Sequence, residues 1–430
     1  MIDLGAFRKD PAAFRAAWAA RGAEVDVDAL LTLDTQVREL KTRSEALLAE
    51  VNAASKAIAQ ATRAGQDVTA AKEKARQLGD QAKALDGQRA EVEGRLTEQL
   101  LRVPNPCLPQ VPVGTCATDN RVAGEWGSKP TFAFKPKAHW DLGPALGLMD
   151  FDRAAKLSGS GFVVLTGLGA RLSRALVSFF LDRHTLQNGY SELAVPFLVT
   201  PEVMTGTGQL PKFADQLYRC ADDELLLIPT AEVPVTNFHR DEILDAAELP
   251  RKYCAHTPCF RREAGAAGIG TRGMTRVHQF DKVEMVWMTM PERAEADLLV
   301  MRGHAEGLLR ELGLHYRVLE LCTGDTGFSS AHTFDLEVWS PGTDSWLEVS
   351  SCSNFGDFQA RRMGLRWRAE PKGKPAPLAT INGSGLAVPR CLIALMETYQ
   401  QSDGSLIIPE VLRSYMGVER IDARVAKGKA

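Results

Sequence analysis

The segment from Val27 to Arg102 constrains the fold more than any other part of the sequence. It contains no proline and is rich in Ala, Leu, Glu, Gln, Lys and Arg, which are good helix formers. Its apolar residues recur at alternating intervals of three and four, the heptad spacing of a coiled-coil seam. The first seam consists of Leu30, Leu33, Val37, Leu40, Ser44, Leu47, Val51, Ala54, Ile58 and Ala61, with Ser44 its one polar member. The second consists of Ala71, Ala75, Leu78, Ala82, Leu85, Arg89, Val92, Leu96 and Gln99, of which Arg89 and Gln99 are polar.

The two seams predict an antiparallel helical hairpin. We expect helices at about 27–63 and 68–102, with Gly65 suited to ending the first and Asp67 to capping the second. Each helix then extends roughly 50 Å, at about 1.5 Å per residue. Such an arm has little core of its own. Its spacing alone leaves three roles open: a solvated coiled coil, a dimerisation arm or a nucleic-acid-binding arm.

Composition limits the class of protein. The 430 residues allow two or three domains at roughly 150 residues each. The net charge of −3 excludes a generally basic nucleic-acid-binding surface, although it does not exclude a local basic one. No apolar run approaches the roughly 18 residues that span a membrane, and the charged N-terminal segment lacks a signal-peptide core. The eight cysteines form no CxxC pair, so we expect free thiols in a reducing cytoplasm.

A proline-rich linker, Val103–Val113, separates the hairpin from a body that mixes strands and helices. Neither a G-x-G-x-x-G sequence opening a βαβ unit nor a G-x4-G-K-[ST] sequence is present, so neither a Rossmann nor a P-loop nucleotide site is indicated. We expect an α+β fold, with a largely antiparallel sheet flanked by helices. The expected strands are Leu193–Val199, Leu225–Ile228, Thr275–Thr289, Thr333–Val338 and Ser345–Ser351, and the expected helices are Ala170–Asn188 and Gly385–Gln401.

Two clusters in the first half of the body concentrate polar side chains. Thr230 and Glu232 lie in a loop between two prolines. Arg261 and Glu263 lie on one face of a predicted hairpin, whose tip is a glycine-rich loop that carries Arg272. Simpler structural explanations are an exposed loop carboxylate for the first cluster and a salt-bridged hairpin for the second.

Two further clusters follow. Glu348 and Ser350 share a face of a predicted strand, with Ser351 where the strand should end, and oxygen ligands of this type suit Mg²⁺. A Gly-Ser-Gly turn around Ser384 then leads into a helix whose first turns carry Arg390. The simpler explanations are a serine turn at a strand end and a glycine turn followed by a surface arginine.

Together these clusters resemble the motifs of seryl-tRNA synthetases of the bacterial type. The resemblance covers nearly the whole chain. It includes the hairpin arm, the Thr-Ala-Glu loop, Phe-Arg-x-Glu-Ala-Gly with its Thr-Arg-Gly tip, Glu-x-Ser-Ser-Cys-Ser-Asn-Phe-Gly-Asp-Phe-Gln-Ala-Arg-Arg, and Asn-Gly-Ser-Gly-Leu-Ala-Val-x-Arg. It implies an N-terminal tRNA-binding domain at 1–104 and a class II catalytic domain at 105–430. Within the latter, motif 1 lies at about 170–199, motif 2 at about 253–284 and motif 3 at about 380–401.

The resemblance implies an ATP-dependent ligase that forms seryl-adenylate and then transfers serine to serine tRNA. Selenocysteine tRNA is a further candidate acceptor. The enzyme is expected to be a cytoplasmic homodimer without membrane association, and motif 1, with Pro196, is expected to build its dimer interface. The arm is expected to contact the long variable arm of the tRNA. The tRNA-binding residues implied are Lys41, Arg43, Lys56, Lys72, Lys74, Arg76 and Arg272.

The resemblance also implies roles for site residues. Arg261 should hold the α-phosphate and the serine carboxylate, and Glu263 should contact the adenine amino group. Phe280 and Arg390 should sandwich the adenine ring. The implied catalytic residues are Arg261, Arg390 and Glu348; the serine site comprises Thr230, Ala231, Glu232, Arg261, Glu284, Asn382 and Ser384; the ATP site comprises Arg261, Arg262, Glu263, Phe280, Glu348, Val349, Ser350, Ser351 and Arg390; and Glu348 and Ser351 should ligate Mg²⁺ held by ATP, with no zinc expected.

The residue chemistry agrees with this function. Adenylate formation needs no activated side-chain nucleophile, because the substrate carboxylate is already one. The protein must position the reactants and neutralise charge on the phosphate, which arginines and Mg²⁺ can do. Glu232 and Glu284 can hydrogen-bond the serine hydroxyl and attract its ammonium group, so alanine would be rejected by roughly 10⁴ or more.

Some positions depart from the family pattern, namely Arg262, Ile269-Gly270 and Pro389. The loop change at Ile269-Gly270 leaves the acceptor-stem contacts open. Two alternative functions remain. One is a non-catalytic paralogue that binds tRNA or a protein partner, and the other is an aminoacyl ligase for a carrier protein, which would not need the long arm.

Overall fold

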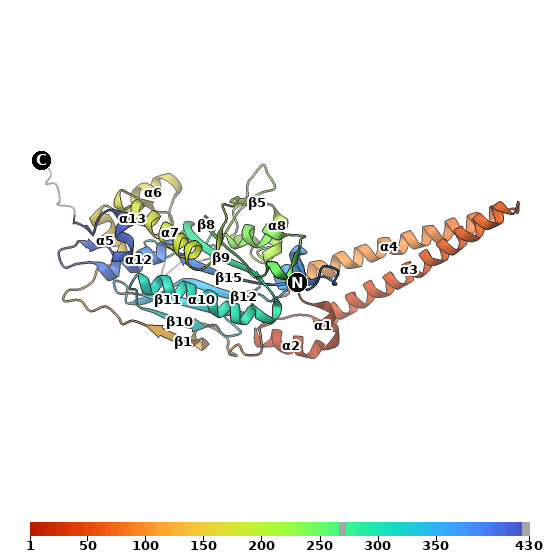
Figure 1. The fold of residues 1–430 in the computed structure, drawn as a ribbon, viewed down its shortest axis with the longest axis horizontal. Helices are drawn as coiled ribbons and strands as arrows, with labels where there is room; N and C mark the ends of the chain where they lie inside the picture. Colours follow the sequence, from red (N-terminus) through yellow and green to blue (C-terminus); the bar gives the residue numbers. More distant parts are fainter. Residues whose placement is uncertain (266–271, 424–430) are drawn as a thin grey trace. The chain divides into compact units, whose positions relative to one another are not determined.

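The computed structural model describes residues 1–265 and 272–423, and these divide into two compact units (Figure 1). The smaller unit comprises Asp3–Ala19 and Ala23–Val103. The larger unit comprises Met1–Ile2, Ala20–Gly22 and the chain from Pro104 onward. No helix within the described ranges has both the length and the apolar character needed to cross a membrane.

The smaller unit is entirely helical, and it confirms the expected hairpin. Its helices are α1 (Leu4–Lys9), α2 (Pro11–Ala20), α3 (Val27–Arg63) and α4 (Thr69–Arg102). The long helices α3 and α4 pack against each other along their length (Figure 1). Every residue of the first predicted seam is buried or half-buried, from Leu30 to Ala61, because each turns its side chain toward α4.

The turn between α3 and α4 uses a glycine and an aspartate. Gly65 has φ +74°, a left-handed conformation that ends α3 and favours glycine. The Asp67 carboxylate accepts a hydrogen bond of 2.9 Å from the Thr69 backbone amide, although Val68 occupies the N-cap position of α4. At the far end of α4 the predicted seam is off by one residue, since Gln99 is exposed and Leu100 is buried.

The larger unit is built on an eight-stranded sheet, with strand order β1-β10-β11-β12-β15-β9-β8-β4. Neighbouring strands are antiparallel except β4 and β8, which are parallel. This arrangement confirms the expected α+β body. The strands of this sheet are β1 (Arg121–Trp126), β4 (Ser191–Glu192), β8 (Arg251–Phe260), β9 (Gln279–Thr289), β10 (Tyr316–Glu320), β11 (His332–Ser340), β12 (Ser345–Asn354) and β15 (Ala379–Ala387).

Short strands and helices complete this unit. The smaller sheets are formed by β2 (Met149–Asp150), β3 (Val164–Leu165), β5 (Leu198–Val199), β6 (Leu226–Leu227), β7 (Ile243–Asp245), β13 (Arg366–Arg368), β14 (Ala376–Pro377), β16 (Leu406–Ile407) and β17 (Arg420–Ile421). The α-helices are α5 (His139–Leu146), α6 (Phe151–Ser158), α7 (Leu168–Leu186), α8 (Pro201–Thr207), α9 (Glu232–Thr236), α10 (Ala294–Glu311), α11 (Phe358–Met363), α12 (Val388–Tyr399) and α13 (Glu410–Met416).

Three of the expected strands are shorter in the structure. The run Leu225–Ile228 forms a strand only at Leu226–Leu227. The run Leu193–Val199 forms a strand only at Leu198–Val199, which agrees with Pro196 lacking the amide that a strand interior requires. The strand expected from Thr275 begins at Gln279. The residues before it form the wall of a cleft described below.

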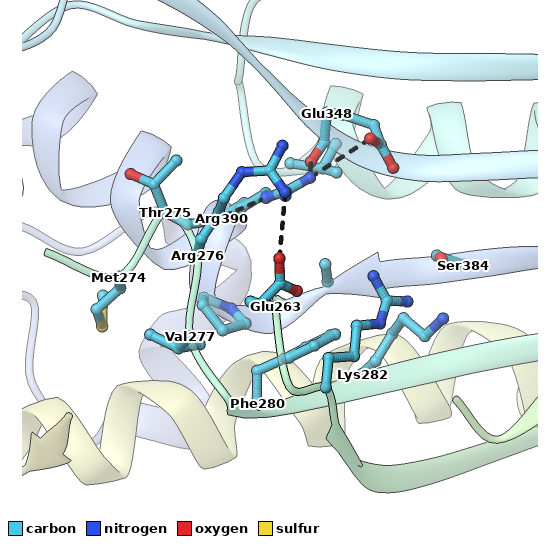
Figure 2. Close-up of a pocket in the computed structure, with 14 residues that line it drawn as sticks. Glu263, Met274, Thr275, Arg276, Val277, Phe280, Lys282, Glu348, Ser384 and Arg390 are labelled. Carbon is cyan, nitrogen blue, oxygen red and sulfur yellow. Dashed lines mark hydrogen bonds and ion pairs between the residues drawn. The ribbon is translucent and has the colours of Figure 1, made fainter. Parts of the chain in front are cut away.

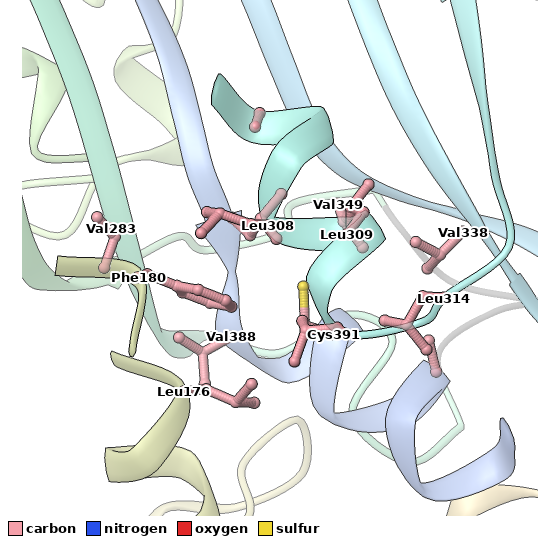
Figure 3. Packing of buried hydrophobic residues seen from close by; sticks show 14 of the residues in the cluster. Leu176, Phe180, Val283, Leu308, Leu309, Leu314, Val338, Val349, Val388 and Cys391 are labelled. Atoms are coloured by element: carbon pink, nitrogen blue, oxygen red, sulfur yellow. The ribbon is translucent and has the colours of Figure 1, made fainter. Parts of the chain in front are cut away.

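The main hydrophobic core lies on one face of the sheet. Alternate residues of β9, namely Val283, Met285 and Trp287, point into this core. Helices α7, α10 and α12 supply the opposing side chains, and Figure 3 shows Phe180 and Leu308 among them. The intervening β9 residues face the other side of the sheet, where the polar residues of the sequence clusters gather.

The Gly-Ser-Gly sequence is not a turn, so this part of the prediction was wrong. Gly383, Ser384 and Gly385 lie inside β15. The glycines are needed for close packing. A Cβ on Gly383 would lie 2.7 Å from the Cys352 sulfur, and one on Gly385 would lie 2.6 Å from Nε2 of His184. The helix that follows therefore begins at Val388, after the strand.

Replacing Gly385 with alanine should destabilise the protein. The added Cβ cannot fit against the buried His184 ring without a shift of the sheet or of α7, so we expect a cost of about 1–3 kcal/mol. The measurement is the midpoint of chemical denaturation. The control is Gly303→Ala, because Gly303 is exposed in α10 and a Cβ there meets no atom within 4 Å. Equal midpoints for the two variants would contradict the packing argument.

Candidate active site

An open cleft lies at the polar face of the sheet. Strands β9, β12 and β15 contribute to it, together with the segment between β8 and β9 and the start of α12. In Figure 2, Lys282 and Ser384 lie at one end of the cleft, and Met274 and Thr275 lie at the other. The lining residues are Arg261, Glu263, Met274, Thr275, Arg276, Val277, Phe280, Lys282, Glu348, Val349, Ser384, Ala387, Pro389 and Arg390.

Arg261 follows directly after β8 and is held from several sides. Its backbone amide donates to the His278 carbonyl at 2.9 Å, which closes the hairpin. Its Nε donates to the Pro229 carbonyl at 3.3 Å. Its guanidinium carbon lies 5.2 Å from the centre of the Phe280 ring, a distance typical of a cation–π contact. These contacts present a fixed positive charge inside the cleft.

Glu263, two residues after Arg261, also lines the cleft, and its backbone has a φ of +46°. This conformation is uncommon for a residue other than glycine, and such outliers concentrate at functional sites. The Glu263 carboxylate pairs with Arg276 at 3.2 Å, as Figure 2 shows. Arg276 therefore supplies a second cation at the cleft and holds Glu263 toward it.

Arg390 lies in the first turn of α12 and spans the cleft to two other segments. Its Nη1 donates to the Glu348 carbonyl at 2.7 Å and lies 3.5 Å from the Glu348 carboxylate. Its Nε donates to the Thr275 carbonyl at 3.3 Å. Arg390 thus joins β12 and the segment before β9 across a cleft that is open between them.

A bulge in β12 changes which residues share a face. The sequence suggests that Glu348 and Ser350 lie on one face, but the register shifts between Leu336 and Glu337 of β11. Because of the extra β12 residue, Glu348 pairs with Glu337 and Ser351 pairs with Asp335, so Glu348 and Ser351 share the cleft face.

Ser350 faces the opposite way. It is 1% exposed, and its hydroxyl donates to the Ser384 carbonyl at 2.6 Å. The expected face for Ser350 was therefore wrong. Cys352 is also buried, and burial raises the pKa of its thiol to about 12. A thiol so rarely ionised is a poor nucleophile.

Oxygen atoms around Glu348 and Ser351 suit a divalent cation. Asp335 lies beside them, and its Oδ1 is buried without a hydrogen-bond partner. Burial, and then the charge of Glu348, hold the pKa of Asp335 well above its ordinary value. A bound cation would relieve both effects. Within the described residues no group of three or more His, Cys, Asp or Glu forms a complete metal site, so other ligands would have to come from a substrate.

Three buried polar side chains form a group at the inner end of the cleft, which is the end where Lys282 and Ser384 lie. Lys282 forms an ion pair with Glu284, and its Nζ donates to the Thr230 hydroxyl at 2.8 Å. The Thr230 hydroxyl in turn donates to the Glu284 carboxylate at 3.1 Å. All three side chains are less than a tenth exposed. A lysine ammonium therefore occupies a place between a carboxylate and a hydroxyl, which is an environment suited to any ammonium group.

Glu232 extends this group at the start of α9. Gln359 of α11 donates a hydrogen bond of 2.7 Å to its carboxylate. Burial, and then the charge of Glu284, raise the pKa of Glu232 to about 7. Lys282 and Arg261 offset only part of this rise, so a further positive charge beside Glu232 would favour its ionised form.

The remaining expected residues divide into those near the cleft and those away from it. Val349 lines the cleft, and Asn382 lies two residues before Ser384 on the same face of β15. Ala231 is fully buried, and Arg262 is exposed. Ile269 and Gly270 lie outside the described residues. The arm residues Lys41, Arg43, Lys56, Lys72, Lys74 and Arg76 are all exposed on α3 and α4, and Arg272 is exposed beside Trp140.

Sequence reasoning gave no role to four residues of the site. Lys282 could have been found, because Phe280, Lys282 and Glu284 alternate along one strand face. Arg276 lies four residues after Arg272 of the predicted hairpin tip, but sequence reasoning assigned it no partner. Gln359 stands in a quoted motif but was assigned no role. Asp335 carries no local signal, since it reaches the site only through strand pairing with β12.

Comparison with known families confirms the resemblance noted in the sequence. The sequence model of the seryl-tRNA synthetase N-terminal domain matches residues 1–107. The model of the tRNA synthetase class II core domain (G, H, P, S and T) matches residues 217–399.

Individual relatives agree over the full length. The serine--tRNA ligase of Nitratidesulfovibrio vulgaris strain Hildenborough is 51% identical over 98% of this chain and 100% of its own length. That of Geobacter sulfurreducens is 50% identical over 97% of this chain and 99% of its own length. The crystal structure of seryl-tRNA synthetase from Pyrococcus horikoshii complexed with ATP superposes with a TM-score of 0.91, at 35% identity, over 98% of this chain and 100% of that one.

Replacing Glu232 with glutamine should stabilise the protein in a pH-dependent manner. The folded state keeps this carboxyl protonated up to about pH 7, whereas its ordinary pKa is 4.5, so wild-type stability falls as pH rises between these values. The variant's advantage should therefore grow from about pH 4.5 to 7 and stay constant above, at about 1–3 kcal/mol. Denaturation midpoints at several pH values measure it, with exposed Glu292→Gln as control. An advantage that is the same at every pH would contradict the assignment.

Proposed function

The chain belongs to the seryl-tRNA synthetases, ATP-dependent ligases that join serine to tRNA, and we propose that the cleft between β9, β12 and α12 activates serine. Two substrates have to meet there. ATP supplies the α-phosphate, and the serine carboxylate attacks it to release pyrophosphate. The proximity of Arg261 to Lys282, Glu284 and Thr230 supports this assignment most directly, because a cation suited to a phosphate lies near side chains suited to an ammonium group.

Arg261 is the residue on which the first step depends. Its guanidinium can bridge the serine carboxylate and the α-phosphate, which brings nucleophile and electrophile together and offsets charge on the phosphate as the bond forms. Phe280 and Arg390 are suited to holding the adenine ring between an aromatic and a guanidinium plane. Glu263, held by Arg276, can accept a hydrogen bond from the adenine amino group.

Serine recognition falls to the polar group at the inner end. Glu284 and Glu232 can bind the substrate ammonium, and Ser384 and Asn382 lie on the neighbouring strand for the hydroxyl. Lys282 lies beside Glu284 and neutralises part of its charge. Because the hydroxyl partners would otherwise remain unpaired, alanine should bind poorly. Arg262 and Ser350 do not line the cleft, so they are less suited to the direct ATP contacts expected of them.

We assign Mg²⁺ to Glu348 and Ser351, with Asp335 beside them. When bound with ATP, the cation would neutralise phosphate charge. The protein side chains alone provide too few ligands, so the ATP phosphates and water would complete its coordination. The orphaned Asp335 oxygen fits this role.

The second step needs serine tRNA, and we assign the arm to binding it. The exposed basic residues of α3 and α4 can contact phosphates of the tRNA variable arm. Arg272, beside the cleft, can contact the acceptor end. The family resemblance further supports a cytoplasmic homodimer joined through motif 1.

The test of the function is ATP–pyrophosphate exchange, measured with each standard amino acid and without tRNA. We expect exchange with serine alone, followed by charging of serine tRNA. Absence of exchange with every amino acid would instead favour the non-catalytic paralogue. Exchange followed by transfer to a carrier protein, with no tRNA charging, would favour the carrier ligase.

Arg261→Ala should abolish adenylate formation. Loss of one charge-stabilising group in the cleft should reduce the exchange rate by about 10²–10³-fold or more. The matched control is Arg302→Ala, since Arg302 also lies against an aromatic ring, at 4.8 Å from the centre of Phe334, but outside the cleft. Full exchange activity in the Arg261 variant would refute the assignment of the phosphate site.

Neutralising Lys72 and Lys74 together should weaken tRNA charging and leave pyrophosphate exchange unchanged. Each lost phosphate contact should lower the slope of log affinity against log salt by about one. The measurement is the KM for serine tRNA at several salt concentrations, with Lys372→Gln/Lys374→Gln on an exposed loop of the catalytic unit as control. An unchanged KM and salt slope would remove these lysines from the tRNA interface.

A further inference from the structure

A buried histidine outside the cleft connects to its wall. His139 is the first residue of α5, and its side chain is 0% exposed. It does not line the cleft. Its sequence position is more than a hundred residues from the segment between β8 and β9, so no local pattern indicates a connection between them.

The δ side of the His139 ring is fixed by Glu397 of α12. The Glu397 carboxylate is also fully buried, and four donors surround it. The His139 backbone amide donates at 2.8 Å, and Nδ1 lies at 3.0 Å. The Gly342 amide donates to the second oxygen at 3.0 Å, and the Ser340 hydroxyl also donates to it. Because a carboxylate with four donors can only accept, Nδ1 must carry the proton of this hydrogen bond.

The ε side of the ring is then an acceptor, and Met274 uses it. The Met274 backbone amide donates to Nε2 at 3.0 Å. A neutral ring with its proton on Nδ1 satisfies both neighbours at once. His139 therefore links the carboxylate of α12 to the backbone of the segment that leads into β9.

The two residues before Met274 also make close contacts with the first turn of α5. Gly273 has φ +72°, and a Cβ there would lie 2.1 Å from Nε2 of His139, so only glycine lets the backbone come this close. One residue earlier, the Arg272 guanidinium stacks on the Trp140 ring at 4.8 Å, and it lies 3.8 Å from the Asp141 carboxylate. Three successive residues of this segment are thus docked on the first turn of α5.

The docked segment forms part of the cleft. Met274 and Thr275 both line it, and the Thr275 carbonyl accepts the hydrogen bond from Nε of Arg390. Loss of the Met274 anchor would therefore loosen the Thr275 side of Arg390, while Glu348 still holds the other side. We propose that His139 is a positioning residue for ATP: it holds the Met274–Thr275 wall, and through it Arg390, in the geometry that binds the adenine. This inference rests on the proposed function of the cleft as an ATP site.

Two substitutions separate the two sides of the ring. His139→Asn puts an amide nitrogen near the position of Nδ1, so it keeps a donor for Glu397 and loses the acceptor for Met274. His139→Gln puts an amide oxygen near the position of Nε2, so it keeps the acceptor and removes the donor to Glu397. A role in ATP positioning therefore predicts opposite behaviour in two full-length variants of similar size.

The experiment compares both variants with wild type in serine-dependent pyrophosphate exchange. For His139→Asn we expect the KM for ATP to rise about tenfold, with the KM for serine unchanged. For His139→Gln we expect a KM for ATP within about twofold of wild type, despite a lower thermal midpoint. Gly273→Ala should reproduce the His139→Asn result, because the added Cβ forces the backbone away from the ring.

Hydrogen–deuterium exchange provides a readout that does not depend on activity. The Met274 amide should be protected in wild type and in His139→Gln, and should exchange faster in His139→Asn. If the KM for ATP follows the thermal midpoint in both variants, or if Met274 is equally protected in all three proteins, the positioning role is refuted. If wild type activates no amino acid, the proposed function fails, while the Met274 exchange data still decide whether His139 anchors the wall.

Discussion

Successive side chains of β9 point to opposite faces of the sheet, and both the core and the cleft depend on this alternation. Val283, Met285 and Trp287 join the hydrophobic core beneath α7, α10 and α12. Lys282 and Glu284, which alternate with them along the strand, face the polar side. A shift of the register by one residue would exchange the two sets, so burial of the apolar set also fixes the position of the charged set. One strand register therefore determines both the packing of the core and the geometry of the site.

The buried charges at this site contribute little to the free energy of folding. Lys282, Glu284 and Thr230 satisfy one another, but desolvation of a buried ion pair usually costs about as much as the pair gains. Glu232 adds a second carboxylate, whose pKa is raised to about 7 by burial and by its charged neighbour. A substrate ammonium group bound beside Glu232 would favour its ionised form. Substrate binding would then recover part of the free energy that burial of these charged groups costs.

Small departures from regular strand geometry complete the site. The bulge in β12 turns Ser351, rather than Ser350, to the side of Glu348 and Asp335. The glycines of β15 let that strand pack against Cys352 and His184 without side chains between them. Gly273 allows the segment before β9 to contact His139 in the same manner. In each case one residue alters the direction or the closeness of a backbone that is otherwise regular.

The sequence by itself determined the elements whose signals are local. The heptad seams predict α3 and α4, because the apolar side chains along one helix face must pack against a partner. The motifs likewise identify Arg261, Glu263, Glu348 and Arg390, all of which line the cleft. Tertiary structure alone decided what depends on the pairing of distant segments. The face of Ser350, the extended glycines of β15, the orphaned Asp335 and the contact of His139 with Met274 all follow from strand register or helix packing across long stretches of chain. Such contacts leave no periodic pattern, because each partner is placed by a different element of the fold.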